Sequence, residues 1–114
     1  MQSLPECQAD DHEDNRAIPL PDEISCNTAA ALFRALGEPS RLQLAIILAQ
    51  QEMCVTQLAK IVNDSLPSIS QRLKLLKAER IVTSRREGKH VFYKLDDDHI
   101  AQLIRNAVEH AGEK

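Results

Sequence analysis

Four side chains near the C-terminus have the types and the spacing of a metal site. Asp97 and His99 stand two residues apart, His110 follows eleven residues after His99, and Glu113 comes three residues later. Imidazole nitrogen and carboxylate oxygen are ordinary ligands of Zn²⁺, which usually takes four of them at about 2.0–2.2 Å. Zinc needs neutral histidines, so its affinity should fall as the pH drops through about 6.5.

A single amphipathic helix, predicted over residues 96–112, carries these side chains. At about 100° per residue, His99 and His110 point within about 20° of each other, and Glu113 shares nearly the same face. Asp97 can join His99 only from the non-helical residues at the start of the helix. The residues alone leave two readings open, a set of metal ligands or solvated side chains. An apolar stripe lies beside them and consists of Ile100, Leu103, Ile104, Ala107, Val108 and Ala111.

One copy of this helix cannot bring all four side chains to one ion. A rise of about 1.5 Å per residue separates His99 from His110 by about 16 Å. Two copies packed antiparallel about a two-fold axis would bring Asp97 and His99 of one chain to His110 and Glu113 of the other, and would create two identical sites. The ligand set therefore implies a homodimer, although the apolar stripe is almost as well suited to packing on its own domain.

Three cysteines stand at wide spacings, namely Cys7, Cys26 and Cys54. An odd number disfavours a disulfide framework and is typical of a reduced, cytoplasmic chain. Two thiols and an imidazole can hold an ion, so Cys54 with Cys7 and His12 is a possible second metal or thiol site. The other reading makes Cys54 a small buried residue and Cys26 a packing residue near the first helix.

The chain has the length of one domain and is acidic overall, but it contains a basic block. The 114 residues have a net charge of −3, yet residues 60–94 hold nine bases and three acids, a net charge of +6. This block fits a DNA phosphate backbone, and a solvated basic face is the other reading. Three aromatic residues and no Trp disfavour single-stranded nucleic acid, which is usually bound by base stacking.

The periodicity predicts an acidic mobile tail over residues 1–23 and one domain over residues 24–114. Gly37 is expected to end the first helix in the left-handed conformation. The fourth helix and the basic hairpin that follows it predict a mainly α fold with a β-hairpin wing, a winged helix-turn-helix. The predicted helices cover residues 29–36, 40–50, 55–62, 66–80 and 96–112, and the hairpin covers 81–95.

The fourth helix is expected to enter the major groove of double-stranded DNA, and the wing is expected to grip the backbone. Ser68, Gln71 and Arg72 are the predicted base and phosphate contacts. The remaining candidates on the helix are Ser65, Ser70 and Lys74, and those on the wing are Arg85, Arg86 and Lys89.

Over residues 28–113 the chain resembles the ArsR/SmtB family of metal-sensing winged-helix repressors. The segments that carry the resemblance are LGEPSRLQLAIIL, EMCVTQLAKIV, SLPSISQRLKLLKAERIV, SRREGKHVFYKL and DDDHIAQLIRNAVEHAGE. The last is similar to the D-x-H, ten residues, H-x-x-E pattern of sensors with a site on the C-terminal helix. That pattern falls on Asp97, His99, His110 and Glu113 without a gap.

The resemblance implies a cytoplasmic repressor that is homodimeric through its terminal helices. The metal-free dimer would bind a palindromic operator, and Zn(II), or Co(II) or Cd(II), would release it and derepress metal efflux or sequestration genes. The family also has a cysteine site that reads C-V-C at the third helix. Here Cys54, Val55 and Thr56 stand in its place, so the second thiol is missing.

Two other functions compete with this reading. The same fold could sense soft metals or oxidants through Cys54 with Cys7 or Cys26, or the chain could be a small helical interaction protein or metal buffer without a DNA role. An enzyme is not indicated, because there is no Gly-rich phosphate loop and no pattern of an activated nucleophile. The sequence contains no apolar run of about 18 residues, so it predicts no membrane span.

Overall fold

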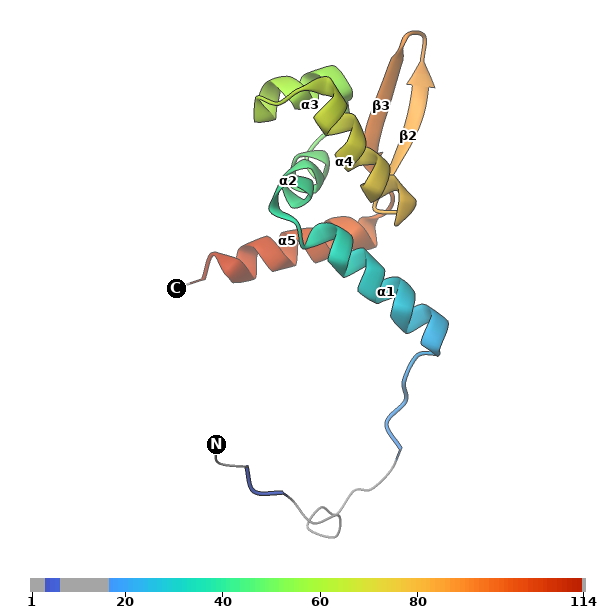
Figure 1. Cartoon of the computed structure of the whole chain (residues 1–114), viewed down its shortest axis with the longest axis vertical. Coiled ribbons are helices and arrows are strands. Elements are labelled where there is room, and N and C mark those ends of the chain that lie inside the picture. The colour runs from blue at the N-terminus through green and yellow to red at the C-terminus, as the bar shows by residue number, and fades with distance from the viewer. Residues whose placement is uncertain (1–3, 7–16, 114) are drawn as a thin grey trace.

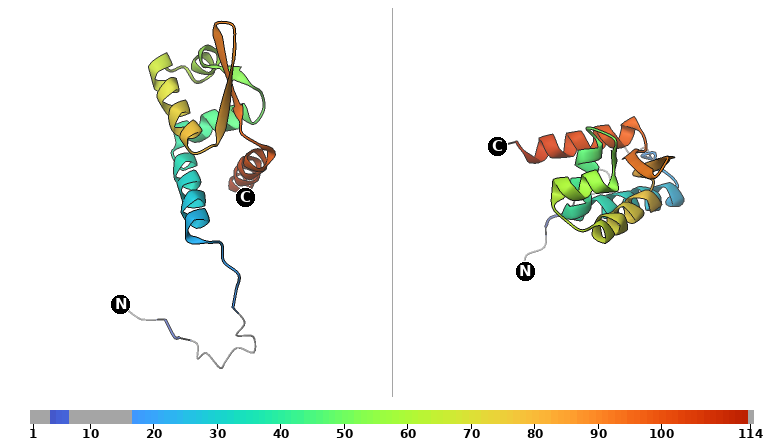
Figure 2. Two further views of the ribbon diagram at one scale, coloured as in Figure 1. Left: turned by 90° about the vertical axis from the view of Figure 1, so that its right-hand side faces the viewer. Right: turned by 90° about the horizontal axis from the view of Figure 1, so that it is seen from above.

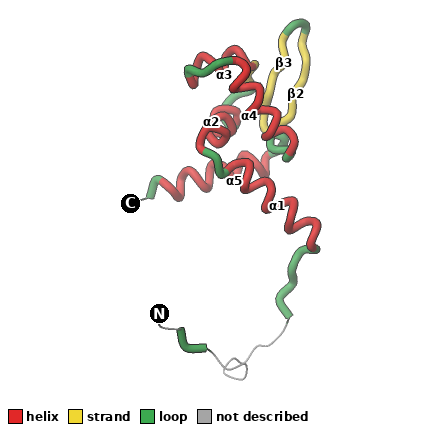
Figure 3. The backbone as a smooth tube through the Cα atoms, viewed as in Figure 1, coloured by secondary structure: helices red, strands yellow, loops and turns green. Residues whose placement is uncertain are grey.

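The computed structural model describes residues 4–6 and 17–113 of the chain (Figure 1). Helices α3 and α4 with their connecting turn form the helix-turn-helix, and β2 and β3 form the wing, so the predicted winged helix-turn-helix is confirmed (Figure 3). In chain order the elements are α1 (Glu23–Leu36), α2 (Pro39–Leu48), β1 (Met53–Cys54), α3 (Val55–Val62), α4 (Leu66–Ala78), β2 (Val82–Glu87), β3 (His90–Leu95) and α5 (Asp98–Ala111).

Side-chain caps explain where four of the helices begin. Asp22, Glu38, Ser65 and Asp97 each accept a hydrogen bond from a backbone N–H in the first turn of α1, α2, α4 and α5, respectively. The first N–H groups of a helix have no partner inside it, so such an acceptor fixes the start. Helix α1 accordingly begins at Glu23, well before the predicted residue 29, because the Asp22 carboxylate accepts from the Ser25 N–H at 2.7 Å.

The predicted conformation of Gly37 and several predicted helix ends are wrong. Helix α2 ends at Leu48 and not at residue 50, and α5 covers Asp98–Ala111 and not 96–112. Gly37 has φ −76° and is right-handed, and Glu38 directly after it is the N-cap of α2. A Cβ atom on Gly37 would lie 3.1 Å from the Phe33 carbonyl oxygen, so the glycine permits a close approach of the backbone. Helix α4 ends at Ala78, before the predicted residue 80, and Arg80 turns the chain with φ 58°.

The sheet has the strand order β1-β3-β2, and both pairings are antiparallel. Strand β1 was not predicted from the sequence. The hairpin places Arg85 opposite Phe92 and Glu87 opposite His90, and Gly88 forms its turn with φ 62°, a conformation that favours glycine.

The core lies around α2, which packs against α1, α4, α5 and β3. Leu44 of α2, Leu58 of α3 and Leu73 of α4 are fully buried together. Burial of this apolar surface is the main force that fixes the elements relative to one another. The wing projects from one side of this core, away from α5 (Figure 2). Among the described residues, no helix has the length and apolar character that would let it cross a bilayer.

Candidate metal centre and DNA-binding surface

Two of the predicted metal ligands meet at the start of α5. Asp97 is the N-cap with extended backbone, and its Oδ1 atom accepts from the Ile100 N–H at 3.0 Å. Its Oδ2 atom lies 3.8 Å from Nδ1 of His99, whose side chain is 96% exposed. From the sequence, Asp97 could approach His99 only from outside the helix, and Asp97 does lie outside it.

The other two predicted ligands meet at the end of α5. Nδ1 of His110 lies 3.6 Å from Oε2 of Glu113, and both side chains are largely exposed. The C-terminal half of α5 extends beyond the other helices (Figures 1 and 2), so this pair faces open surroundings in a single chain.

Each pair has the spacing of two ligands on one ion. Two ligand atoms at about 2.0–2.1 Å from a tetrahedral zinc ion lie about 3.3 Å apart, close to the observed 3.8 Å and 3.6 Å. Residues 4–6 and 17–113 contain no group of three or more His, Cys, Asp or Glu side chains that could hold an ion. One chain therefore carries two separate candidate half-sites of two residues each, one at each end of α5.

An apolar groove is lined by side chains of α1, α2 and α5. It has a volume of about 190 Å³. Phe33 of α1 is 58% exposed, and Val108 further along α5 is 44% exposed. The side chains that line the groove are Phe33, Leu36, Gly37, Leu42, Leu103, Ile104 and Ala107.

Helix α4 presents a polar face opposite its buried stripe. Ile69, Leu73 and Leu76 are fully buried, and the exposed side chains around the opposite face include Ser70, Gln71 and Lys74. Ser65 caps the helix by accepting from the Ser68 N–H at 3.3 Å.

Arg72 lies at the flank of α4 and is held by Asp64. Its Nη2 atom donates to Oδ2 of Asp64 at 2.6 Å, and its side chain is only 22% exposed. The same carboxylate oxygen accepts from the Ser68 hydroxyl at 3.2 Å. The Ser65 N–H and then Arg72 hold the pKa of Asp64 below its usual value. Arg72 and Ser68 therefore take part in an internal network, and the free polar groups of α4 are those on the opposite face.

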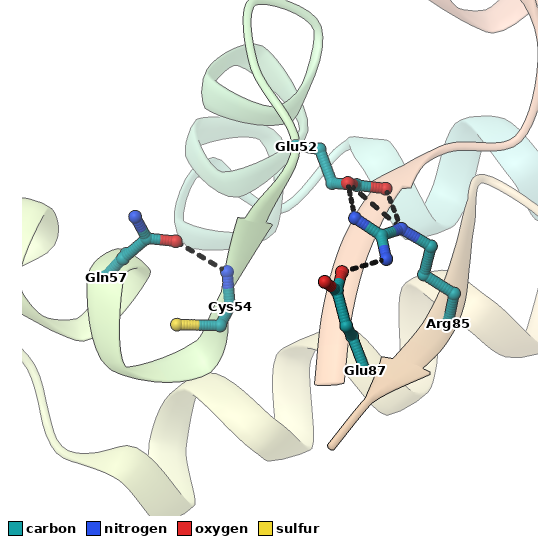
Figure 4. Close-up of polar contacts among 5 residues, drawn as sticks. All are labelled: Glu52, Cys54, Gln57, Arg85 and Glu87. Atoms are coloured by element: carbon teal, nitrogen blue, oxygen red, sulfur yellow. Dashed lines mark hydrogen bonds and ion pairs between the residues drawn. The ribbon is translucent and has the colours of Figure 1, made fainter. Parts of the chain in front are cut away.

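The three predicted cations of the wing differ in their surroundings. Arg86 and Lys89 are exposed. Arg85 is bound by two carboxylates, Glu52 before β1 and Glu87 on its own strand (Figure 4). Glu52 and Asp64 were both missed in the sequence. Asp64 could have been found from its place directly before the cap of α4, whereas Glu52 stands 33 residues from Arg85 and gives no local signal.

Cys26 and Cys54 are both free thiols in the part of the chain that the structure describes. Cys54 begins α3, is half-buried, and lines a small pocket with Lys89 and His90 of the wing. Cys26 is exposed on α1, so the prediction that it packs near the first helix is wrong for the single chain. Cys7 and His12 lie outside the described residues.

The sequence matches known regulators over most of its length. The family model for bacterial regulatory proteins of the arsR family covers residues 38–84. The regulator KmtR of Mycobacterium tuberculosis is 40% identical over 104 residues, which are 89% of this chain and 79% of that protein. The repressor SmtB of the same organism is 41% identical over 95 residues, or 83% and 70%.

Two further comparisons extend the match. A homologue of the cadmium resistance transcriptional regulatory protein CadC from Staphylococcus aureus is 38% identical over 105 residues, or 90% of this chain and 87% of that protein. The homodimeric winged helix-turn-helix DNA-binding domain of Mb0332 from Mycobacterium bovis superposes with a TM-score of 0.74 at 30% identity and covers 77% of this chain and 82% of that one. This chain therefore belongs to the arsR family of bacterial regulatory proteins, and it is a winged helix-turn-helix transcriptional regulator and not an enzyme.

Proposed function

We propose that the chain is a metal-released, dimeric repressor that binds operator DNA in the cytoplasm. The observation that carries the proposal is the pair of half-sites at the two ends of α5, Asp97 with His99 and His110 with Glu113, each spaced as two ligands of one ion. Two antiparallel α5 helices about a two-fold axis would complete two four-ligand sites.

The exposed apolar surface of α1 and α5 supports the dimer. Phe33 and Val108 would lose contact with water when a second copy covers them, and this burial favours association. The relative Mb0332 is described as homodimeric. Residues 24–114 form the DNA-binding and dimerisation domain in this proposal, and residues 1–23 form an acidic tail.

The DNA-binding surface would consist of α4 in the major groove and the wing on the backbone. Ser70, Gln71 and Lys74 would reach bases and phosphates, and Arg86 and Lys89 would contact phosphates. Two such surfaces related by a two-fold axis predict a palindromic operator with half-sites spaced by whole helical turns.

The ligand chemistry supports zinc as the regulator. Two imidazoles and two carboxylates fit Zn(II), and also Co(II) or Cd(II), so availability decides among them. The name of the CadC relative refers to cadmium resistance. A bound ion would tie the two α5 helices together and favour one orientation of the two α4 helices. An orientation that does not match the operator would weaken DNA binding, with a coupling of about 1–3 kcal/mol, and would derepress metal efflux or sequestration genes.

A titration of ZnCl₂ into the protein on a labelled palindromic duplex tests the proposal. We expect zinc to release the wild-type protein, and we expect His99→Ala and His110→Ala to bind the duplex but resist zinc. His90→Ala, which removes an imidazole from the wing, should keep its zinc response. A normal zinc response in either α5 variant would remove the proposal.

Sensing through thiols is the second candidate, since Cys54 is accessible at the pocket beside the wing. Replacement of Cys7, Cys26 and Cys54 by Ser separates the two candidates. The proposed function requires that zinc still release this variant from DNA, whereas a thiol sensor would lose its response.

A further inference from the structure

The side chain of Arg85 crosses the three-stranded sheet from one edge toward the other. Arg85 lies on β2, opposite Phe92 of the central strand β3, and Phe92 in turn lies opposite Cys54 of β1. The Arg85 guanidinium carbon sits 4.9 Å from the centre of the Phe92 ring. On the far side it reaches Glu52, directly before β1 (Figure 4).

All three guanidinium nitrogens of Arg85 are bound within the chain. Nε donates to both carboxylate oxygens of Glu52 at 3.1 Å, and Nη2 donates to Oε1 of Glu52 at 2.7 Å. Nη1 donates to Glu87 at 2.6 Å. This fork-to-fork arrangement is the most directional ion pair that proteins form. Three of the five N–H groups of Arg85 are therefore bonded to carboxylates of its own chain, although the side chain remains 50% exposed.

The side chain of Arg85 and those of the adjacent residues Ser84 and Arg86 lie on opposite faces of the sheet. Ser84 accepts from Nζ of Lys77 on α4 at 2.8 Å, so Ser84 faces α4. Successive residues of a strand point to opposite faces, and Arg86 therefore shares the face of Ser84 whereas Arg85 points to the other face. Of the two arginines, Arg86 is the one on the side of the proposed recognition helix.

We propose that Arg85 is a positioning residue. Its ion pair with Glu52, the Arg85–Glu52 strap, connects the wing to the segment between α2 and α3 and fixes the angle of the wing relative to α4. In this arrangement Arg86 and Lys89 make the phosphate contacts of the wing, and Arg85 makes none. The consequence for DNA binding rests on the proposed function, whereas the strap itself is a property of the free protein.

We expect the ion pair between Arg85 and Glu52 to persist over a wide pH range. Hydrogen bonding to Arg85 holds the pKa of Glu52 below its usual value, and the charge of Lys94 acts in the same direction. Glu52 first and Glu87 second raise the pKa of Arg85. Both partners are therefore charged at neutral pH.

The strap is tested first without DNA. In Glu52→Gln and Arg85→Gln, we expect the backbone amides of β2 and β3 to exchange with solvent at least about fivefold faster than in the wild type, while amides of α2 and α4 keep their protection. Arg86→Gln, one residue away, is the matched control and should leave exchange unchanged. Unchanged exchange in both strap variants would overturn the proposal.

Duplex binding over a series of salt concentrations then separates a strap from a phosphate contact. We expect Glu52→Gln and Arg85→Gln to weaken binding by about fivefold each, the double variant to be no weaker than either, and the salt slope to stay constant. The charge swap Glu52→Arg with Arg85→Glu should recover most of the loss. Arg86→Gln should reduce the slope by about 0.9.

A different set of results would overturn the assignment. If Glu52→Gln tightened duplex binding and Arg85→Gln lowered the salt slope, Arg85 would be a phosphate contact that Glu52 masks. If the wild-type protein bound no duplex in a salt-dependent way, the proposed function would fail, and the exchange rates alone would decide whether the strap exists.

Discussion

At the scale of single residues, Asp97 has two roles that different oxygens serve. Oδ1 caps α5, and Oδ2 faces His99. Asparagine caps helices about as well as aspartate but is a poorer zinc ligand, whereas alanine does neither. We therefore expect Asp97→Asn to keep the thermal stability of the metal-free protein and to lose zinc affinity.

Asp97→Ala should lose zinc affinity as well and should also destabilise the metal-free protein by about 1 kcal/mol. Denaturant unfolding and competition with a zinc chelator measure the two effects separately. Wild-type zinc affinity in Asp97→Asn would show that the carboxylate is not a ligand.

A second prediction at this scale concerns pH. Histidine ordinarily titrates near pH 6.5, so zinc affinity should fall steeply between pH 7.5 and 5.5, with up to two protons displaced per ion. Competition with a chelator of known pH dependence measures the affinity. A constant affinity across this range would argue against ligation by His99 and His110.

The fold should survive the same change in pH. The folded-state pKa values of Asp64 and Glu52 lie below their usual values of 3.8 and 4.5. Groups of this kind stabilise the fold above the unfolded-state pKa, and that stabilisation is lost as the pH falls through the lower folded-state value. Circular dichroism of the metal-free protein should therefore not change between pH 7.5 and 5.5, which separates loss of zinc from unfolding.

At the scale of elements, the wing depends on one glycine. Gly88 has φ 62°, and a Cβ atom there would meet nothing within 4 Å, so a substitution is opposed by backbone strain alone. We expect Gly88→Ala to destabilise the hairpin by about 1 kcal/mol and Gly88→Asn to cost less, because Asn tolerates the left-handed region. Hydrogen exchange of β2 and β3 measures the effect, and equal costs for the two variants would contradict the assignment to strain.

Local signals predicted some elements well. Helix α3 has the predicted bounds, 55–62, and both strands of the hairpin fall within the predicted range 81–95. Strand β1 was missed, since two residues carry no periodicity and form a strand only because β3 lies beside them.

The acidic partners of the predicted DNA-binding arginines were not predicted from the sequence. The sequence placed Arg72 and Arg85 among the DNA contacts, but charge patterns do not show which cations meet acids across the fold. Asp64 and Glu52 bind these two arginines. Asp64 is local to Arg72 and stands directly before the cap of α4, whereas only the packing of the sheet brings Glu52 to Arg85. The relative positions of His99 and His110 could be predicted from the sequence, because the rise and turn of one helix fix them, whereas their role as metal ligands stays a prediction.

At the scale of the whole molecule, we expect each metal site to be shared by two chains. If each site takes Asp97 and His99 from one chain and His110 and Glu113 from the other, a dimer of one His99→Ala chain and one His110→Ala chain has one intact site. Its second site lacks both histidines. A site contained within one chain would be damaged in both subunits.

The number of zinc ions that bind tightly to this heterodimer, purified through two different affinity tags, decides whether each site is shared between two chains. We expect one tight ion per heterodimer, half of the wild-type number, with wild-type affinity, and no tight ion in either variant homodimer. A heterodimer without a tight site, or a variant homodimer that retains two, would contradict the sharing of sites between chains.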